Sequence, residues 1–485
     1  MWVPTYFHLH PSPLATLTRE PEVSMRRSIV GLATLLLLLV SASVCRASTP
    51  TVLYNFCSVG ECLDGSHPVG DLVSDENGNL YGTTSAGGSN NLGTVFALCA
   101  PGALAPPVCA GSLTYTEIVL HSFTGSPADG ATPLAGLVYE QISGNLYGTT
   151  SAGGSGSCSG GCGTVFAINS DGGTLTVLHN FLGGTDGAPP KAELLEDSFG
   201  NFYGTTSLGG SGSCGQGCGT VFTLNPGSST YTVIYSLHGS PDGANAVAGL
   251  AFDSTGNLWG TAKNGGKANL GSIFELTTGG TLVYTRSFAG KTDGANPAAA
   301  LAFDPAIGAL GTFYGTTEAG GAPFCSGGCG TVFELQPHTM GSPAYNNFYQ
   351  FTGAGPARTG SAPIARLTVD TGMGDELQHY VYGTASLGGK NTGACPSSGC
   401  GTAFLICPPT ISCPVIKRET TLFAFDGTHG ANPASSLLID LSLLPQSHEN
   451  TRFPPPGRPQ CTSNCIGTGQ NDGENGGGVV VALTD

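Results

Sequence analysis

A heptapeptide, GNLYGTT at residues 78–84, returns along the whole chain and constrains the fold more than any other feature. Close copies follow at intervals of roughly 55 to 85 residues. They read GNLYGTT at 144–150, GNFYGTT at 200–206, GNLWGTA at 256–262, GTFYGTT at 311–317, VYGTA at 381–385 and a degenerate IGTG at 466–469. Units of this length bury their apolar faces against their neighbours, so seven copies predict one continuous repeat domain.

Four short apolar runs, bounded by Gly, Asp, Asn or Pro, lie in each repeat unit and indicate antiparallel strands. In the fourth unit they are 250–253 (LAFD), 257–261 (NLWGT), 271–276 (GSIFEL) and 282–288 (LVYTRSF). Asp253 and Gly256 lie where a tight turn between the first two strands needs a side-chain acceptor and a positive φ. Four strands in each unit predict a propeller blade.

The two ends of the repeat region predict how the ring closes. Residues 51–56 (TVLYNF) align with the last strand of a unit, whereas 478–483 (GVVVAL) align with the third. We therefore expect an all-β, seven-bladed β-propeller of four-stranded antiparallel blades, in which the N-terminal strand completes the last blade. Such a closure leaves no unpaired edge at the junction of the ring.

Composition agrees with a turn-rich β protein and excludes one class of partner. Only 10% of the residues are charged and 77 of 485 are Gly, which argues against a helical bundle or coiled coil. The formal charge of −16 argues against nucleic acid, because phosphate binding needs clustered Lys and Arg.

The residues before the repeats divide into two parts. Met25-Arg26-Arg27, the apolar run 29–44 and Cys45-Arg46-Ala47 have the basic start, short hydrophobic stretch and small-residue end of a secretory signal. We expect a signal peptide at 25–47 and a single propeller at 48–485, and interpret 1–24 as a disordered extension from a mis-assigned start. A retained membrane anchor and lipidation at Cys45 stay open as alternatives, although a spanning helix needs roughly 20 apolar residues.

Cysteine spacing supports export. The chain has 17 Cys, and all except Cys45 have a partner close in sequence, which indicates disulfides formed in an oxidising compartment. The expected pairs are Cys57–Cys62, Cys99–Cys109, Cys158–Cys162, Cys214–Cys218, Cys325–Cys329, Cys395–Cys400, Cys407–Cys413 and Cys461–Cys465. Zinc half-sites are the alternative for the four pairs that precede Gly-Thr, but each pair belongs to a different unit, whereas four ligands must surround one metal.

The run LxxD-xxGNLYGTTxxGGxxxxGTVFxL, followed by VLxSF and GxxDGAxP, closely resembles the Gloeo/Verruco (GloVer) tandem repeat of choice-of-anchor proteins. The first two strands are also similar, more distantly, to those of NHL-type propellers. The resemblance covers residues 51–485, and units six and seven are degenerate. It implies an exported, surface-associated propeller of unestablished activity. Members carry C-terminal anchors, whereas no apolar stretch follows Asp440, so we expect free secretion.

A loop between successive units carries Asp-Gly in five copies. If these carboxylates surround the mouth of the central channel, they are candidate ligands for calcium or for sugar hydroxyls. The alternative is that each Asp accepts backbone hydrogen bonds within its own turn. The five residues are Asp64, Asp129, Asp186, Asp242 and Asp293, and Thr359 and His429 replace them in the last two units.

No unique catalytic group appears, so an enzyme is the less favoured reading. We expect a secreted, monomeric, non-enzymatic module that binds an extracellular polysaccharide or protein without a cofactor, with calcium as the one candidate ion. A lyase or lactonase with a metal at the channel mouth, or a structural matrix protein, are the alternatives. Positions at which the copies disagree, such as Arg358, Arg366 and the insertion 441–459, are where a specific site would lie.

Overall fold

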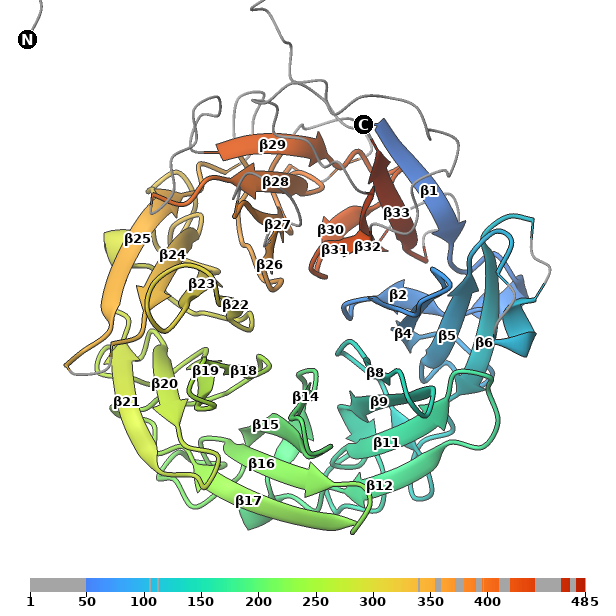
Figure 1. Ribbon diagram of the computed structural model, residues 1–485, viewed down its shortest axis with the longest axis horizontal. Coiled ribbons are helices and arrows are strands. Elements are labelled where there is room, and N and C mark those ends of the chain that lie inside the picture. The colour runs from blue at the N-terminus through green and yellow to red at the C-terminus, as the bar shows by residue number, and fades with distance from the viewer. Residues whose placement is uncertain are drawn as a thin grey trace, which may run out of the picture. The chain divides into compact units, whose positions relative to one another are not determined.

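The strands of each repeat unit hydrogen-bond to one another and form a small antiparallel sheet. The computed structural model describes residues 49–103, 106–110, 113–338, 341–353, 359–370, 379–389, 395, 397–409, 419–440, 464–471 and 477–484. All of them belong to one unit of the chain, Ala47–Asp485. Within this unit the sheets stand around a central axis as a β-propeller (Figure 1).

Six sheets each come from one continuous stretch of chain. The first contains β2 (Ser66–Pro68), β3 (Val73–Ser74), β4 (Leu80–Ala86), β5 (Thr94–Cys99) and β6 (Thr116–Ser122). The second contains β8 (Val138–Glu140), β9 (Asn145–Thr150), β11 (Thr164–Asn169) and β12 (Thr176–Asn180), and in the same unit β7 (Gly130–Ala131) pairs with β10 (Ala152–Gly153). The third contains β13 (Ala188–Pro190), β14 (Leu195–Glu196), β15 (Phe202–Leu208), β16 (Thr220–Asn225) and β17 (Thr230–Ser236).

The next three sheets repeat this order with four strands each. They are β18 (Ala251–Phe252), β19 (Leu258–Ala262), β20 (Ser272–Leu276) and β21 (Leu282–Ser287); β22 (Ala302–Asp304), β23 (Thr312–Thr317), β24 (Thr331–Gln336) and β25 (Ala344–Gln350); and β26 (Thr368–Val369), β27 (Val381–Ala385), β28 (Thr402–Ile406) and β29 (Glu419–Ala424). Four 3-10 turns lie in loops: η1 (Gly60–Cys62), η2 (Pro107–Cys109), η3 (Gly184–Asp186) and η4 (Lys291–Asp293). The strands predicted for the fourth unit correspond to β18–β21.

A further sheet combines strands from both ends of the chain (Figure 1). It contains β30 (Ala431–Pro433), β31 (Leu438–Asp440), β32 (Asn464–Asn471), β33 (Val479–Thr484) and β1 (Thr49–Asn55). β1 runs antiparallel to β33, with Thr49 opposite Thr484 and Asn55 opposite Val479.

The Gly of each YGTT copy leaves space for an aromatic ring. A Cβ added at Gly82 would lie 2.7 Å from Cζ of Phe96 on the neighbouring strand and 2.8 Å from Leu72. The same pairing of Gly with a Phe of the next strand recurs at Gly148 and Phe166. Real carbon atoms do not approach this closely, so the ring occupies the space that a side chain would need.

The two Thr residues of YGTT form different hydrogen bonds. In five copies the hydroxyl of the first donates to the next unit, as Thr83 does to the carbonyl oxygen of Ala135 at 2.9 Å. The second bonds within its own sheet, as Thr84 does with the hydroxyl of Thr94 at 2.8 Å. The motif therefore joins neighbouring sheets as well as the strands of one sheet.

The hydrophobic core is divided into clusters that lie between successive sheets. Tyr81 packs with Leu146 and Phe166 of the second unit, and Tyr203 packs with Leu250 and Phe274 of the fourth. Tyr81 and Trp259 are fully buried. The aromatic residues of the repeat therefore fill the space between sheets, as packed sheets require.

The predicted turns are fixed by their Asp residues. Oδ1 of Asp253 accepts hydrogen bonds from the backbone N–H of Thr255 at 2.8 Å and of Asn257 at 3.0 Å. Its other oxygen accepts from the indole N–H of Trp259 at 2.9 Å. One carboxylate thus fixes both the turn and the buried aromatic ring that follows it.

Six of the expected cysteine pairs are disulfide-bonded. They are Cys57–Cys62, Cys99–Cys109, Cys158–Cys162, Cys214–Cys218, Cys325–Cys329 and Cys395–Cys400. Cys413 and Cys461 lie outside the described residues, so the pairs Cys407–Cys413 and Cys461–Cys465 stay predictions. The signal segment 25–47 and the extension 1–24 also lie outside them. Among the residues that are described, no helix has the length and apolar character to cross a membrane.

Candidate functional site

The five Asp residues of the Asp-Gly loops accept hydrogen bonds within their own loops. Each carboxylate binds a backbone N–H from the preceding residues, at 2.8 to 3.1 Å. The pairs are Asp64 with Ser58, Asp129 with Thr124, Asp186 with Leu182, Asp242 with His238 and Asp293 with Ala289. These bonds are the ones expected for a loop-fixing role. A cation or sugar at these carboxylates stays a prediction.

Each of these carboxylates also binds a side chain of the preceding outermost strand, a partner that the sequence reasoning missed. The five partners are Tyr54, His121, His179, Tyr235 and Arg286, with distances of 2.5 to 3.2 Å. The sequence feature that could have indicated these partners is the variable position of the VLxSF strand, which carries a polar side chain in each of these units. Burial acts to raise the pKa of Asp129, but hydrogen bonds from His121, Thr124 and Gly130 hold it below its ordinary value.

The last two units fix this loop differently. Thr359 accepts the backbone N–H of Thr352 at 3.3 Å, and in unit seven Asp426 accepts the N–H of His429 at 2.9 Å. Thr359 therefore keeps an acceptor at the Asp position, whereas in unit seven the carboxylate lies three residues earlier, at Asp426, and His429 donates to it. Arg358 and the insertion 441–459 lie outside the described residues.

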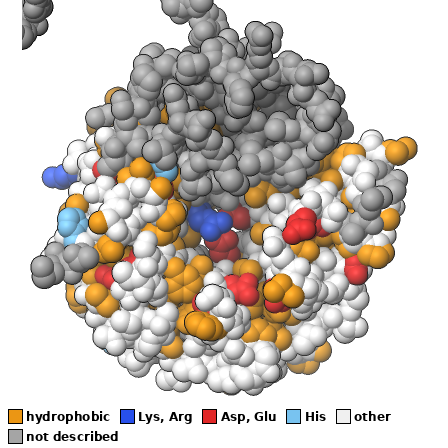
Figure 2. Space-filling view, viewed as in Figure 1, with side chains coloured by type: hydrophobic (Ala, Val, Ile, Leu, Met, Phe, Trp, Pro, Cys, Tyr) orange, Lys and Arg blue, Asp and Glu red, His pale blue; other side chains and the backbone are white. Residues whose placement is uncertain are grey.

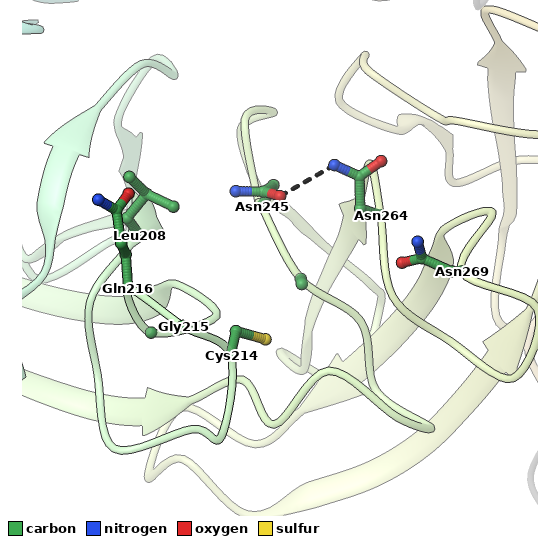
Figure 3. A pocket seen from close by; sticks show the side chains of 9 residues that line it. Leu208, Cys214, Gly215, Gln216, Asn245, Asn264 and Asn269 are labelled. Carbon is green, nitrogen blue, oxygen red and sulfur yellow. Dashed lines mark hydrogen bonds between the residues drawn. The ribbon is translucent and has the colours of Figure 1, made fainter.

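A groove of about 410 Å³ lies between the third and fourth units (Figure 3). We call it the amide groove, because its polar side chains are all carboxamides. It is lined by Leu208, Cys214, Gly215, Gln216, Gly217, Ala244, Asn245, Asn264 and Asn269. No charged side chain contributes to this lining.

Local backbone structure explains the presence of two of these amides. Asn245 has φ 58° and Asn269 has φ 56°, a left-handed conformation that Asn tolerates better than most residues. Oδ1 of Asn269 accepts the N–H of Gly265 at 2.9 Å. Gln216 is exposed in the loop that the Cys214–Cys218 disulfide closes, and its side-chain amide bonds to no described residue.

A chain of hydrogen bonds orients Asn245 and Asn264, and Figure 3 shows the bond between these two residues. Asn296 donates to Oδ1 of Asn264 at 3.3 Å, Asn264 donates to Oδ1 of Asn245 at 2.9 Å, and Asn245 donates to the carbonyl oxygen of Ser207 at 2.8 Å. This chain crosses from the fifth unit to the third. The amides are therefore held in place before any ligand arrives, which reduces the entropy lost on binding.

The repeat itself does not require Gln216 or Asn264, whereas the position of Asn245 is Asn again at Asn296 and Asn432. Gly160 and Gly327 take the place of Gln216 in the equivalent CSGGC loops, and Ala152 and Ala319 take the place of Asn264. Gln216, Asn245 and Asn264 therefore come together only at the junction of units three and four, where the copies differ.

Chemically, the amide groove presents donors and acceptors of hydrogen bonds without formal charge. A carboxamide offers two N–H donors and an acceptor oxygen, which matches the hydroxyl groups of a neutral polyol. Among the described residues, no group of three or more His, Cys, Asp or Glu is placed to hold a metal ion.

Comparison with known proteins identifies the family. The Gloeobacter/Verrucomicrobia repeat matches residues 43–217 and 211–445. Among solved structures, a putative 6-phosphogluconolactonase from Bacteroides uniformis is 14% identical, with a TM-score of 0.40, over 69% of this chain and 80% of that chain. A putative oxidoreductase (glucose dehydrogenase) from Thermus thermophilus is 12% identical, with a TM-score of 0.39, over 70% and 94%. No curated protein matches the sequence. Because the two matches span most of its length, the chain belongs to the Gloeobacter/Verrucomicrobia repeat family.

Proposed function

We propose that this protein is an exported, non-enzymatic binding module that takes a neutral extracellular glycan in the amide groove. The observation that carries the proposal is the meeting of Gln216, Asn245 and Asn264 at one junction of an otherwise regular ring. Sugar hydroxyls are recognised by planar amides that donate and accept at once. Export is supported by the six disulfides, because such bonds persist in oxidising compartments.

We also infer that the ring has seven blades and that the N-terminal strand completes the last one. The pairing of β1 with β33 supports this inference. A hydrophobic cluster that joins Phe56, which directly follows β1, and Val480 of β33 to Leu80 and Phe96 of the first unit supports it as well. Closure by both ends would make the ring, and hence the shape of its grooves, independent of any anchor.

The glycan proposal is tested with purified protein and a panel of polysaccharides. Neutral xylan, mannan and glucan fragments are compared with the polyuronates alginate and pectin by isothermal titration. We expect binding to a neutral glycan and none to the polyuronates, because the chain carries −16 formal charges and the groove offers no cation. Gln216→Ala should weaken binding roughly 2- to 12-fold, the value of one hydrogen bond of about 0.5–1.5 kcal/mol.

The matched control is Asn77→Ala. Asn77 is also an exposed amide, but it lies in the turn between β3 and β4 and is not part of the groove lining. Equal losses for both variants, or no binding to any glycan, would overturn the proposal. A thermal shift with calcium alone, abolished by Asp186→Asn with Asp242→Asn, would instead favour the Asp-Gly loops as the site.

A further inference from the structure

Three charged residues occupy one repeat position next to the central axis. This position directly precedes the conserved Leu that leads into each innermost strand. Its seven residues are Asp71, Gly136, Glu193, Gly249, Ala300, Arg366 and Ser436. Four are small or uncharged, whereas Asp71, Glu193 and Arg366 come from units one, three and six. Figure 2 shows basic and acidic side chains together in the hollow at the centre of the ring.

Arg366 joins the two carboxylates across the channel. Its Nη1 lies 2.9 Å from Oε1 of Glu193, and its Nη2 lies 3.5 Å from Oδ2 of Asp71. Asp71 is fixed further by the backbone N–H of Ser436, which donates to Oδ1 at 2.6 Å. We call Asp71, Glu193 and Arg366 the channel clasp, because they connect units that are not neighbours along the chain.

The small residues of the ring make room for the clasp. A Cβ added at Gly249 would lie 3.0 Å from Cγ of Glu193, and one added at Gly136 would lie 2.8 Å from the carbonyl oxygen of Asp71. The side chains of Asp71 and Glu193 are only 14% and 17% exposed, whereas that of Arg366 is 39% exposed. The carboxylates are therefore held against the wall of the channel, and the side chain of Arg366 is the more exposed partner.

We propose that the channel clasp is a pH-sensitive device: at neutral pH Arg366 holds units one and three together, and proton uptake by Glu193 releases unit three. The released state keeps one guanidinium and one carboxylate, Asp71, so it is electrically balanced. The ionised state carries one excess negative charge in the channel. Release therefore removes a charge that the site holds at a cost.

The electrostatics of Glu193 agree with this geometry. Burial raises the pKa of Glu193 to about 6, while Arg366 acts to lower it and Asp71 to raise it. Because the folded value lies above the ordinary 4.5, protonation of Glu193 favours the folded protein. This contribution to stability is present below about pH 4.5 and is lost as the pH rises through about 6. Because protonation of Glu193 favours the folded protein, we expect acidification to open the clasp without unfolding the ring.

The first test follows Glu193 itself in the full chain. Protein carrying ¹³Cδ-labelled Glu is titrated by NMR, and the signal missing from Glu193→Gln is assigned to Glu193. We expect a midpoint near 6, a higher midpoint in Arg366→Met and a lower one in Asp71→Asn. Lys263→Met is the control, because Lys263 pairs with Glu318 outside the clasp and should leave the midpoint unchanged.

The second test measures release directly. Hydrogen exchange of peptides covering residues 190–196, corrected for intrinsic rates, should be faster at pH 5 than at pH 7.5. In Glu193→Gln the exchange of these peptides should be fast at both pH 5 and pH 7.5. An unshifted midpoint near 4.5, or exchange that is equally pH-independent in both proteins, would overturn the proposal. If Arg366→Met does not fold, the Asp71→Asn variant tests the proposal instead: a titration midpoint of Glu193 that is not lowered by Asp71→Asn would overturn it.

Discussion

The inter-unit hydrogen bond of the first YGTT Thr can be tested within one chain, because among the described residues the hydroxyls of Thr316 and Thr468, at this same repeat position, lack it. The hydroxyl of Thr205, which is 1% exposed, donates to the carbonyl oxygen of Ala248 at 3.0 Å. Thr316 occupies the same repeat position and is equally buried, but its hydroxyl has no hydrogen-bond partner among the described residues. Thr205→Val therefore removes an inter-unit hydrogen bond, whereas Thr316→Val makes the same change of side chain where no such bond is present.

The two substitutions are expected to change the free energy of unfolding differently: Thr205→Val should lower it, and Thr316→Val should leave it unchanged or raise it. Thr205→Val leaves the buried oxygen of Ala248 without this donor, which should destabilise by about 1–3 kcal/mol. Thr316→Val replaces an unsatisfied buried hydroxyl by a methyl group and should be neutral or stabilising by about 1 kcal/mol. Differences in volume and strand propensity cancel between the two, because the local structure is the same.

The assay is thermal and urea unfolding of the two variants beside the parent protein. A cooperative unit as long as Ala47–Asp485 should shift by about 1 °C for each kcal/mol, so denaturant midpoints give the finer measure. We expect a lower midpoint for Thr205→Val and an unchanged or higher one for Thr316→Val. Equal losses would mean that Thr is selected for strand packing and not for the bond between units.

Three further perturbations follow from the same geometry. Gly148→Ala should destabilise by about 1–3 kcal/mol, because its Cβ would lie 2.6 Å from Phe166; an unchanged denaturant midpoint would show that the ring can move aside. Burial and the charge of Asp64 raise the pKa of Glu117 to about 8, so Glu117→Gln should melt above the parent at pH 9 and together with it at pH 4.5; a difference that does not depend on pH would contradict this. Deleting residues 51–56 removes most of β1 and exposes the edge of β33, so we expect a large fall in melting temperature with aggregation; an unchanged melting temperature would refute closure by both ends.

The features that could be predicted from the sequence are those that depend on neighbouring residues. Asp253 and its turn follow from a five-residue pattern, and the structure shows the expected bonds to Thr255 and Asn257. The aromatic residues of YGTT lie between sheets for a similar reason, because their spacing equals one repeat. The propeller itself follows from repetition of such local patterns.

The features that could not be predicted depend on how the strands pair in register or on contacts between units that are distant in the sequence. The close approach of Gly82 to Phe96 requires the pairing of β4 with β5, which places these two residues opposite each other. Side-chain partners of the Asp-Gly loops require the outermost strand to pass beside its own loop. Arg366 was singled out only as a departure from the repeat, since nothing local connects it with residues 71 and 193.

The two proposed sites follow one rule about where a β-propeller tolerates difference between its units. Positions that contact the next sheet, such as Thr205 and Tyr203, are restrained because every unit must offer its neighbour the same surface. The position before the Leu of each unit borders the channel, and the Gln216 position lies in an exposed loop, so both lie outside the clusters that pack successive sheets together. Substitutions there change the chemistry of the propeller without disturbing the packing between its sheets. Charged residues thus accumulate at the axis and amides on one rim, and the uniform repeat carries both sites.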